Sequence, residues 1–304
     1  MVTMRVISLL PSATETVAAL GHSSWLVGRS EECDFPPEVA ALPVVMRARS
    51  LDRDHSSSEI DARVRETRAK HQSLYELDLD LLERLSPDLL ITQDLCSVCS
   101  VTEQEVADAC RRSGISPRIV SLSPTRLAEV WDNIRTVSEA LGDPSAGERL
   151  LRTLRPDERA QATGSKVAVV EWLDPPILAG LWTPDIIERA GGIPVLGRAG
   201  EPGIRTDWER LGQEEIDLLI LSPCSFDVPR TRRELSDPRI AASVAQIRPR
   251  LGTWLADEAY FSRPGPRLAE GVRLVRELVH RSAPTAPMPV ERWSPPEVLL
   301  GAAP

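Results

Sequence analysis

The sequence is poor in aromatic residues, and it lacks long apolar runs and long basic runs. Aromatic residues make up 4% of the 304 positions. No window approaches the roughly 18 consecutive apolar residues that a membrane-spanning helix requires, so no membrane partner is expected. The formal net charge is −9, and without a basic stripe nucleic acid is not an expected partner either. We therefore expect a small-molecule substrate or a metal chelate as the partner.

Several familiar catalytic signatures are also missing. The sequence has no Walker loop, no dinucleotide-binding glycine fingerprint and no Ser-His-Asp arrangement. Its N-terminus shows no basic leader followed by a long apolar stretch, so the expected location is cytoplasmic. In a reducing cytosol, the five cysteines favour thiolate chemistry or metal binding over a disulfide framework.

Strand-length apolar runs alternate with helical patterns along the chain, which predicts βαβ units and mostly parallel sheets. The length suggests two domains. We expect a first α/β lobe over 1–125 with an insertion at 47–73, linking helices over 126–163, a second α/β lobe over 164–281 and an irregular tail over 282–304. The predicted fold class is α/β, with two Rossmann-like lobes.

Within these lobes, apolar runs bounded by turn residues mark the strands. The predicted strands are Arg5–Leu10, Leu26–Arg29, Leu89–Thr92, Arg118–Leu122, Lys166–Glu171, Ile177–Ala179, Leu218–Leu221 and Gly252–Leu255. A long helix is expected over Ser145–Thr163, although Pro156 should kink or restart it. The insertion is interpreted as a helix over Ser58–Lys70 or as a flap.

Four cysteines each follow a predicted strand. Cys33 comes after the second strand, Cys96 and Cys99 after the third, and Cys224 after the run at 218–221. Open α/β sheets bind ligands at the carboxyl ends of their strands. We therefore expect these four thiols to converge there as metal ligands. Cys110, on a helix with apolar spacing, is expected to pack in the core.

A set of four thiolates suits a tetrahedral zinc site or a four-iron cluster. Two other interpretations stay open, a redox dithiol at Cys96 and Cys99 and buried thiols that pack as small hydrophobes. We prefer a [4Fe–4S] cluster over zinc, because a chain of this length needs no zinc staple. With three thiolates bound, the open iron would act as a Lewis acid. The expected function is then a lyase-like or oxidoreductase-like enzyme with a small carboxylated substrate.

Other polar and aromatic residues near strand ends are candidates for the same site. Glu171, Asp174 and Tyr260 are predicted to act as acid/base residues. The predicted ligand-binding residues are Glu15, Gln93, Trp172, Trp182, Arg263 and Arg267. Structural alternatives stay open for some of them. Glu15 also fits a capping box with Ser12, Trp172 also fits a core position, and arginines are usually solvated.

Six stretches of the sequence resemble the helical-backbone (class III) periplasmic substrate-binding proteins, in particular their cobalamin-binding branch. They are Arg5–Glu15, Val27–Ser30, Asp34–Glu38, Leu85–Ile91, Ile187–Gly192 and Tyr260–Arg267. The resemblance implies two Rossmann-like lobes bridged by a long helix, with a ligand cleft between the lobes. Members of this family carry cobalamin, haem or ferric siderophores.

The missing leader and the cysteines make the chain look like a cytosolic branch of this family. The resemblance also supplies an alternative function, which is a non-enzymatic binding protein for cobalamin, another corrinoid or a metal chelate. Under that alternative the cysteines would be axial or structural ligands.

Overall fold

The structure is a computed structural model that describes residues 3–49, 54–70, 73–94, 102–155, 158–281, 283–285 and 287–296. The chain divides into two compact units. Unit 1 comprises Met1–His55, Ala62–Pro124 and Ala128–Pro156, and unit 2 comprises Ser56–Asp61, Thr125–Leu127 and Asp157–Pro304. Each unit is built around its own sheet, so the predicted α/β fold with two lobes is confirmed.

Unit 1 holds a six-stranded sheet in the order β4-β3-β2-β1-β5-β6. Its strands are β1 (Val6–Ser8), β2 (Leu26–Ser30), β3 (Val44–Ala48), β4 (Tyr75–Leu77), β5 (Leu89–Gln93) and β6 (Arg118–Leu122). All neighbours are parallel except β3 and β4. β5, which lies between β1 and β6, is apolar over Leu89–Ile91 and almost inaccessible, as expected for a strand covered on both faces.

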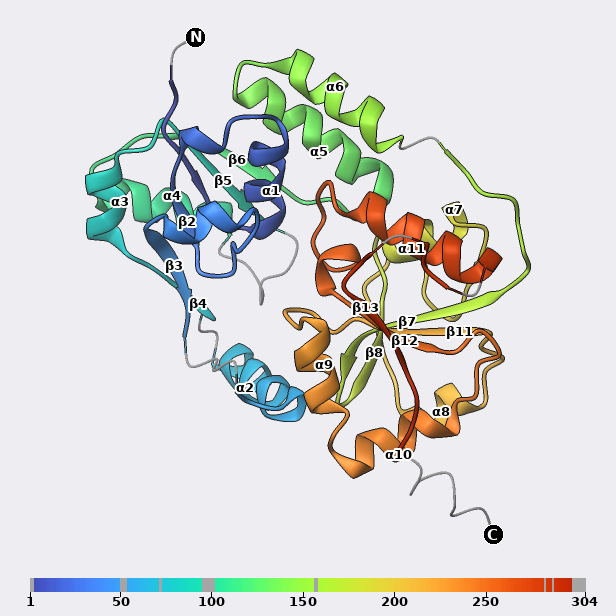
Figure 1. Ribbon diagram of the computed structural model, residues 1–304. Coiled ribbons are helices and arrows are strands. Elements are labelled where there is room, and N and C mark those ends of the chain that lie inside the picture. Colours follow the sequence, from blue (N-terminus) through green and yellow to red (C-terminus); the bar gives the residue numbers. More distant parts are fainter. Residues whose placement is uncertain are drawn as a thin grey trace. The chain divides into compact units, whose positions relative to one another are not determined.

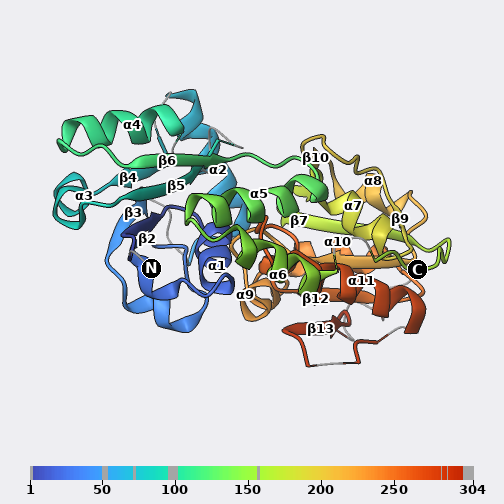
Figure 2. The ribbon, with the colours of Figure 1, turned by 90° about the horizontal axis from the view of Figure 1, so that it is seen from above.

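Helices cover both faces of this sheet, with α3 and α4 on one face and α1 on the other (Figure 2). The helices are α1 (Pro11–Ala19), α2 (Ser57–Ala69), α3 (Leu79–Leu85), α4 (Glu103–Arg112), α5 (Leu127–Ala140) and α6 (Pro144–Leu154). Short 3₁₀ helices lie at η1 (Ser23–Trp25) and η2 (Pro37–Ala41). Thr102 and Glu105 form a capping box that starts α4.

The helix expected over Ser145–Thr163 is shorter in the structure. Asp143 caps α6, and the helix ends at Arg155, which has a left-handed φ of 51°. Proline disfavours the helical conformation in the residue before it. Pro156 therefore accounts for the early end, and a second helical segment does not follow over 158–163.

Unit 2 holds a seven-stranded sheet in the order β10-β8-β7-β11-β12-β13, with β9 paired to β7. Its strands are β7 (Lys166–Leu173), β8 (Pro176–Leu178), β9 (Ile193–Pro194), β10 (Ile204–Arg205), β11 (Leu218–Leu221), β12 (Thr253–Ala256) and β13 (Val290–Trp293). The three central strands β7, β11 and β12 are parallel. β8, β10 and β13 add antiparallel strands.

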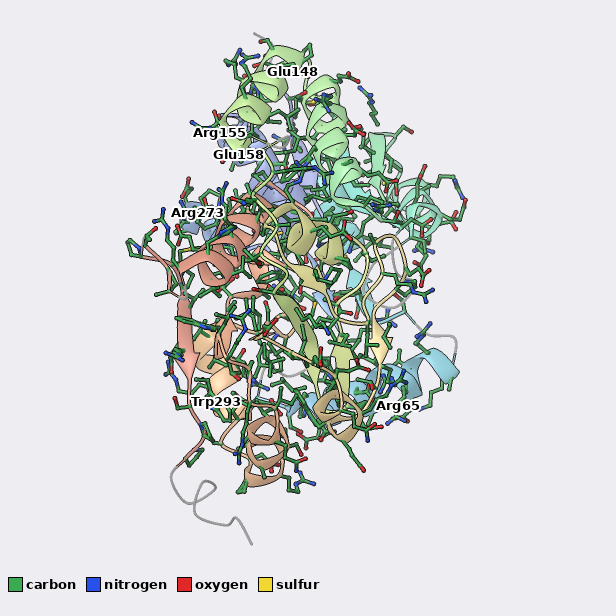
Figure 3. All side chains as sticks on the ribbon, turned by 90° about the vertical axis from the view of Figure 1, so that its right-hand side faces the viewer. Arg65, Glu148, Arg155, Glu158, Arg273 and Trp293 are labelled. Atoms are coloured by element: carbon green, nitrogen blue, oxygen red, sulfur yellow. The ribbon has the colours of Figure 1, made fainter. Side chains whose placement is uncertain are left out.

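The segment expected to be an irregular tail thus contributes a strand. β13 lies at the sheet edge and pairs with β12. Its Trp293 side chain lies at that edge (Figure 3) and packs against the core cluster of unit 2.

The helices of unit 2 form two layers, with α7 and α11 on one face of the sheet and α8 and α10 on the other (Figure 1). They are α7 (Thr183–Arg189), α8 (Trp208–Gly212), α9 (Val228–Glu234), α10 (Pro238–Gln246) and α11 (Leu268–Arg281), with the 3₁₀ helix η3 (Glu258–Tyr260). Asp207, Asp227 and Asp237 cap α8, α9 and α10. Among the described residues, no helix combines the length and apolarity needed to cross a membrane.

Candidate functional site at the strand ends of unit 2

The carboxyl ends of β7 and β11 lie side by side in unit 2. The two strands are parallel and in register, and the loop after β11 stays attached to β7 because the Cys224 amide donates to the Glu171 carbonyl at 3.0 Å. Residues that end β7 and residues that follow β11 therefore meet at one edge of the sheet. This edge is where α/β proteins with parallel strands bind ligands.

An aromatic wall stands at this edge, and we define it as Trp172, Phe226 and Arg230. The Trp172 and Phe226 rings lie 5.4 Å apart between centroids, at an interplanar angle of 51°. The Arg230 guanidinium carbon lies 4.7 Å from the centre of the Phe226 ring, within the range of a cation–π contact. Phe226 is 3% exposed and Arg230 9%, so this apolar surface with its fixed positive charge becomes available to a flat ligand when the residues that cover it are displaced.

The first turn of α2 is bound to this part of unit 2. The Ser57 amide and hydroxyl donate to Glu234 Oε1 at 2.9 and 3.0 Å. The Trp172 indole N–H donates to the Ser57 carbonyl at 3.2 Å. Arg205 donates to both carboxylate oxygens of Asp61, at 2.5 and 3.3 Å.

The Glu171 carboxylate occupies the space that the missing side chain of Gly203 leaves free. A Cβ atom on Gly203 would lie 2.1 Å from the Glu171 carboxylate, so this position accepts no larger residue without displacing that group. Burial raises the pKa of Glu171 to about 7, and a hydrogen bond from the Gly180 backbone opposes the shift. The carboxyl group therefore changes its protonation near neutral pH.

Arg263 is buried and bonded to Glu258. Its guanidinium donates to Glu258 at 2.7 and 2.6 Å, and the other carboxylate oxygen accepts from the Ser225 amide at 2.9 Å. Burial raises the pKa of Glu258, and the Arg263 charge opposes that shift. This ion pair fixes the loop between Cys224 and Phe226, where Ser225 has a left-handed φ of 64°. A direct ligand contact by Arg263 stays a prediction.

The other predicted contacts in unit 2 have varied surroundings. Trp182 is 6% exposed, and its indole donates to the Phe261 carbonyl at 2.6 Å. Tyr260 is buried, which raises its pKa. Asp174 and Arg267 are partly exposed, the first just after β7 and the second just before α11.

In unit 1, buried polar groups gather at the ends of the first strands. Cys33 is 1% exposed, and Thr14 Oγ1 donates to its Sγ at 3.0 Å. Glu15 is also buried. The capping box with Ser12 does not form, because α1 begins at Pro11 behind Leu10 and has no side-chain cap. Gln93 ends β5 and is partly exposed.

The remaining cysteines are distributed over different environments. Cys110 is buried in the core cluster of unit 1, as expected. Cys224 is exposed in unit 2. Cys96 and Cys99 lie outside the described residues. In the described part of the chain, no group of three or more His, Cys, Asp or Glu side chains is placed to hold a metal ion.

The sequence analysis did not predict several residues of this site. They are Ser57, Asp61, Arg205, Phe226, Arg230 and Glu234. Arg230 and Glu234 lie four residues apart on α9, a helix that was not predicted. The signal for α9 was present, because Asp227 followed by a proline two residues later is typical of a helix start.

The comparisons with known proteins identify the fold. No protein-family model matches the chain. The vitamin B12-binding protein of Vibrio cholerae serotype O1 is 23% identical to it over 279 residues, which cover 89% of this chain and 87% of that relative. A periplasmic haem-binding protein from Pseudomonas aeruginosa has a TM-score of 0.66 at 18% identity, with 96% of this chain and 99% of that chain covered. This chain has the fold of the periplasmic binding proteins.

A second solved structure has the same fold. The periplasmic vitamin B12-binding protein of Vibrio cholerae matches with a TM-score of 0.59 at 20% identity, and the match covers 92% of this chain and 97% of that chain. The resemblance to the cobalamin-binding proteins is thus supported. The assignment of this chain to a cytosolic branch is not supported, because these structural neighbours are periplasmic.

These findings correct the main functional interpretation. The iron–sulfur enzyme is wrong, since the relatives are binding proteins for vitamin B12 and haem. The [4Fe–4S] cluster and zinc are wrong as cofactors for the same reason. Metal-ligand roles for Cys33, Cys96, Cys99 and Cys224 stay a prediction. The burial of Cys33 in unit 1 accords with a packed thiol. The expectation of a cytoplasmic protein is overturned as well.

Proposed function

We propose that this protein is a non-enzymatic, periplasmic binding protein for a corrinoid such as cobalamin, which it passes to a membrane transporter. The observation that carries the proposal is the similarity to a vitamin B12-binding protein over 89% of the chain, combined with the same fold. Under this proposal, Glu171, Asp174 and Tyr260 have no catalytic task.

The aromatic wall of unit 2 supports this ligand class. A corrinoid has a broad, flat macrocycle with apolar faces and carboxamide side chains. The Trp172 and Phe226 rings offer it an apolar contact surface. The Trp172 indole N–H is a donor of the kind that a carboxamide oxygen accepts.

Haem is a second candidate, because a periplasmic haem-binding protein has the same fold, with a TM-score of 0.66. Its carboxylates could pair with the guanidinium groups of Arg205 and Arg230. The sequence comparison favours the corrinoid. The two ligands are separated by a direct binding measurement.

The test is titration of the purified chain with cyanocobalamin and, separately, with hemin, followed by calorimetry and absorbance. We expect one cyanocobalamin per chain and weaker binding of hemin. Replacing Trp172 by alanine should weaken cyanocobalamin binding about tenfold or more, because a buried aromatic contact at the centre of a binding surface contributes 1–2 kcal/mol.

Trp293→Ala is the matched control, since Trp293 pairs with Thr253 at the amino end of β12, whereas the aromatic wall lies at the carboxyl ends of the parallel strands β7 and β11. It should leave the affinity unchanged. The proposal fails if the wild-type chain binds no cyanocobalamin, or if the two tryptophan variants bind it equally well.

A further inference from the structure

The aromatic wall is covered by a segment of the same chain. The first turn of α2 is bonded to Glu234 of α9, to the Trp172 indole of the wall and to Arg205. Ser57 is 0% exposed, Asp61 7% and Glu234 8%. A ligand that uses the Trp172 indole N–H or the Glu234 carboxylate must therefore replace this turn.

Ser57 and Asp61 of this turn are bound to the rest of unit 2 by hydrogen bonds and an ion pair. Ser57 and Asp61 are the buried residues of this helix, and neither contributes an apolar side chain to a core. Hydrogen bonds exchange with water at a small net cost, about 0.5–1.5 kcal/mol each, whereas apolar packing would hold the turn firmly. Only the turn at Ser56–Asp61 groups with unit 2, and the helix continues from Ala62 within unit 1. The turn can thus detach without disturbing the core of unit 2.

The groups presented by the turn define what can replace it. Ser57 offers its carbonyl to the Trp172 indole and its N–H to Glu234. These groups belong to the two peptide units on either side of its Cα, so the site binds one acceptor and one donor at neighbouring positions. A primary carboxamide carries both an acceptor and a donor. A carboxylate has no N–H to donate, and its charge would face the Glu234 carboxylate, which is costly away from water.

We propose that the first turn of α2 is a displaceable lid over the aromatic wall, and that the ligand displacing it carries a carboxamide that takes the place of the Ser57 backbone. This inference rests on the proposed binding function and adds two statements to it. The lid competes with the ligand, and Glu234 selects a carboxamide ligand over one that carries carboxylates.

The first experiment weakens the lid without altering the wall. Asp61→Asn removes the charge from the two-bonded contact with Arg205. Asp185→Asn is the matched control, because Arg126 binds Asp185 in the same two-bonded way at 2.6 and 2.8 Å. The arginine is 48% exposed in both pairs.

Two measurements are made on each full-length variant. The first is made without ligand by nitrogen-15 NMR, in which the Trp172 indole N–H signal is assigned with Trp172→Phe. The indole proton should exchange with solvent faster than in wild type in Asp61→Asn, and at the wild-type rate in Asp185→Asn. Apparent affinity scales with the open population, so cyanocobalamin should bind Asp61→Asn about fivefold more tightly than wild type.

Hydrogen exchange of the wild-type chain gives an independent readout. Binding of cyanocobalamin should raise the exchange of the peptide that covers 56–61, since the lid is displaced. A fall in exchange would show that the turn contacts the ligand and would overturn the proposal. Unchanged indole exchange or unchanged affinity in Asp61→Asn would overturn it too.

Glu234→Gln tests the selection step. Glutamine keeps an acceptor for a carboxamide N–H and removes the negative charge. We expect hemin to bind this variant about tenfold more tightly than wild type, with little change for cyanocobalamin. Equal changes for both ligands would refute the selection.

The two proposals fail in different ways. If cyanocobalamin binds the wild-type chain and Trp172→Ala weakens it, while Asp61→Asn behaves like Asp185→Asn, the binding function stands and the lid is refuted. If neither wild type nor Asp61→Asn binds cyanocobalamin, the proposed function fails and the lid inference falls with it.

Discussion

Glu171 has a carboxyl group whose protonation differs from that of a free glutamate. Its carboxyl group lies beside Gly203 and accepts from the Gly180 backbone. Because burial disfavours the charged form, its pKa is raised to about 7. Near neutral pH, the folded chain therefore holds a proton at Glu171 that the unfolded chain has released.

This difference predicts how the stability of the fold depends on pH. The folded state binds more protons than the unfolded state between pH 4.5, the usual pKa, and about 7, so stability should fall as the pH rises through that window and level off above it. Glu171→Gln keeps a neutral side chain. At pH 8 it should be about 2 kcal/mol more stable than wild type. The difference is smaller than the pKa shift alone implies, because solvent at the partly exposed side chain screens part of the electrostatic penalty.

The measurement is urea denaturation of both proteins from pH 4 to 8. At pH 4 the two should be nearly equally stable. Glu188→Gln, at an exposed position of α7, is the control and should follow the wild-type curve. A wild-type stability that rises between pH 4.5 and 7 relative to Glu171→Gln would contradict the raised pKa.

At the residue scale, the sequence identified residue types but could not assign their surroundings. Cys33 and Cys224 do follow strand ends, as predicted, but Cys33 is buried beside Thr14 whereas Cys224 is exposed. Burial depends on which loops fold over a strand end, and that is decided by contacts distant in sequence. Trp172 was found because aromatic residues at a strand end are distinctive. Its partner Phe226 was not, because its position follows from the loop that Glu258 holds.

At the element scale, Glu258 joins η3 to the loop after β11. One of its carboxylate oxygens is paired with Arg263, and the other accepts from the Ser225 amide in that loop. Removing the guanidinium leaves a carboxylate that is 7% exposed without its charged partner. Such a loss costs about 3–5 kcal/mol. Arg263→Ala should therefore destabilise the chain by that amount in chemical denaturation at pH 7.

The control is Arg239→Ala, which removes an exposed partner of Asp237, with the arginine 81% exposed. Surface pairs of this kind contribute about 0–1 kcal/mol. Equal effects of the two substitutions would mean that the buried pair is not needed to hold the loop.

Elements were predictable where one local pattern determines them. β6 and β11 have the predicted bounds, because a short apolar run bounded by turn residues marks each of them. The short strands β3, β4, β10 and β13 were missed. These strands are defined by their pairing with neighbours rather than by their own sequence, and β13 has proline-rich surroundings that normally signal irregular structure.

At the scale of the whole molecule, the chain is two units with separate sheets, so local damage should remain within one unit. A chain ending at Met288 lacks β13, which pairs with β12 over Val290–Trp293. Loss of the Trp293 contact with the core should cost unit 2 about 2 kcal/mol.

Hydrogen exchange measured by mass spectrometry checks this prediction peptide by peptide. Amides of β12 and β11 should exchange faster in the truncated chain, while those of β1 and β5 in unit 1 should be unchanged. Faster exchange throughout both units, or none in either, would contradict the independence of the two units.

The fold class followed from the alternation of strands and helices over the whole length, a signal that many weak local patterns reinforce. The function did not follow, because it depends on ligand chemistry at a few positions. The cysteine spacing suggested a cluster, and similarity to a vitamin B12-binding protein over 89% of the chain outweighs that single motif.

The environment of Cys224 also makes ligand binding observable. Its thiol is exposed, whereas Cys33 and Cys110 are buried, and it precedes Phe226 by two positions. Once Cys96 and Cys99 are replaced by serine, a thiol-reactive fluorophore would attach at this one accessible point. Docking of a strongly absorbing molecule nearby would then be visible as quenched emission, so that arrival and departure can be timed in a stopped-flow instrument.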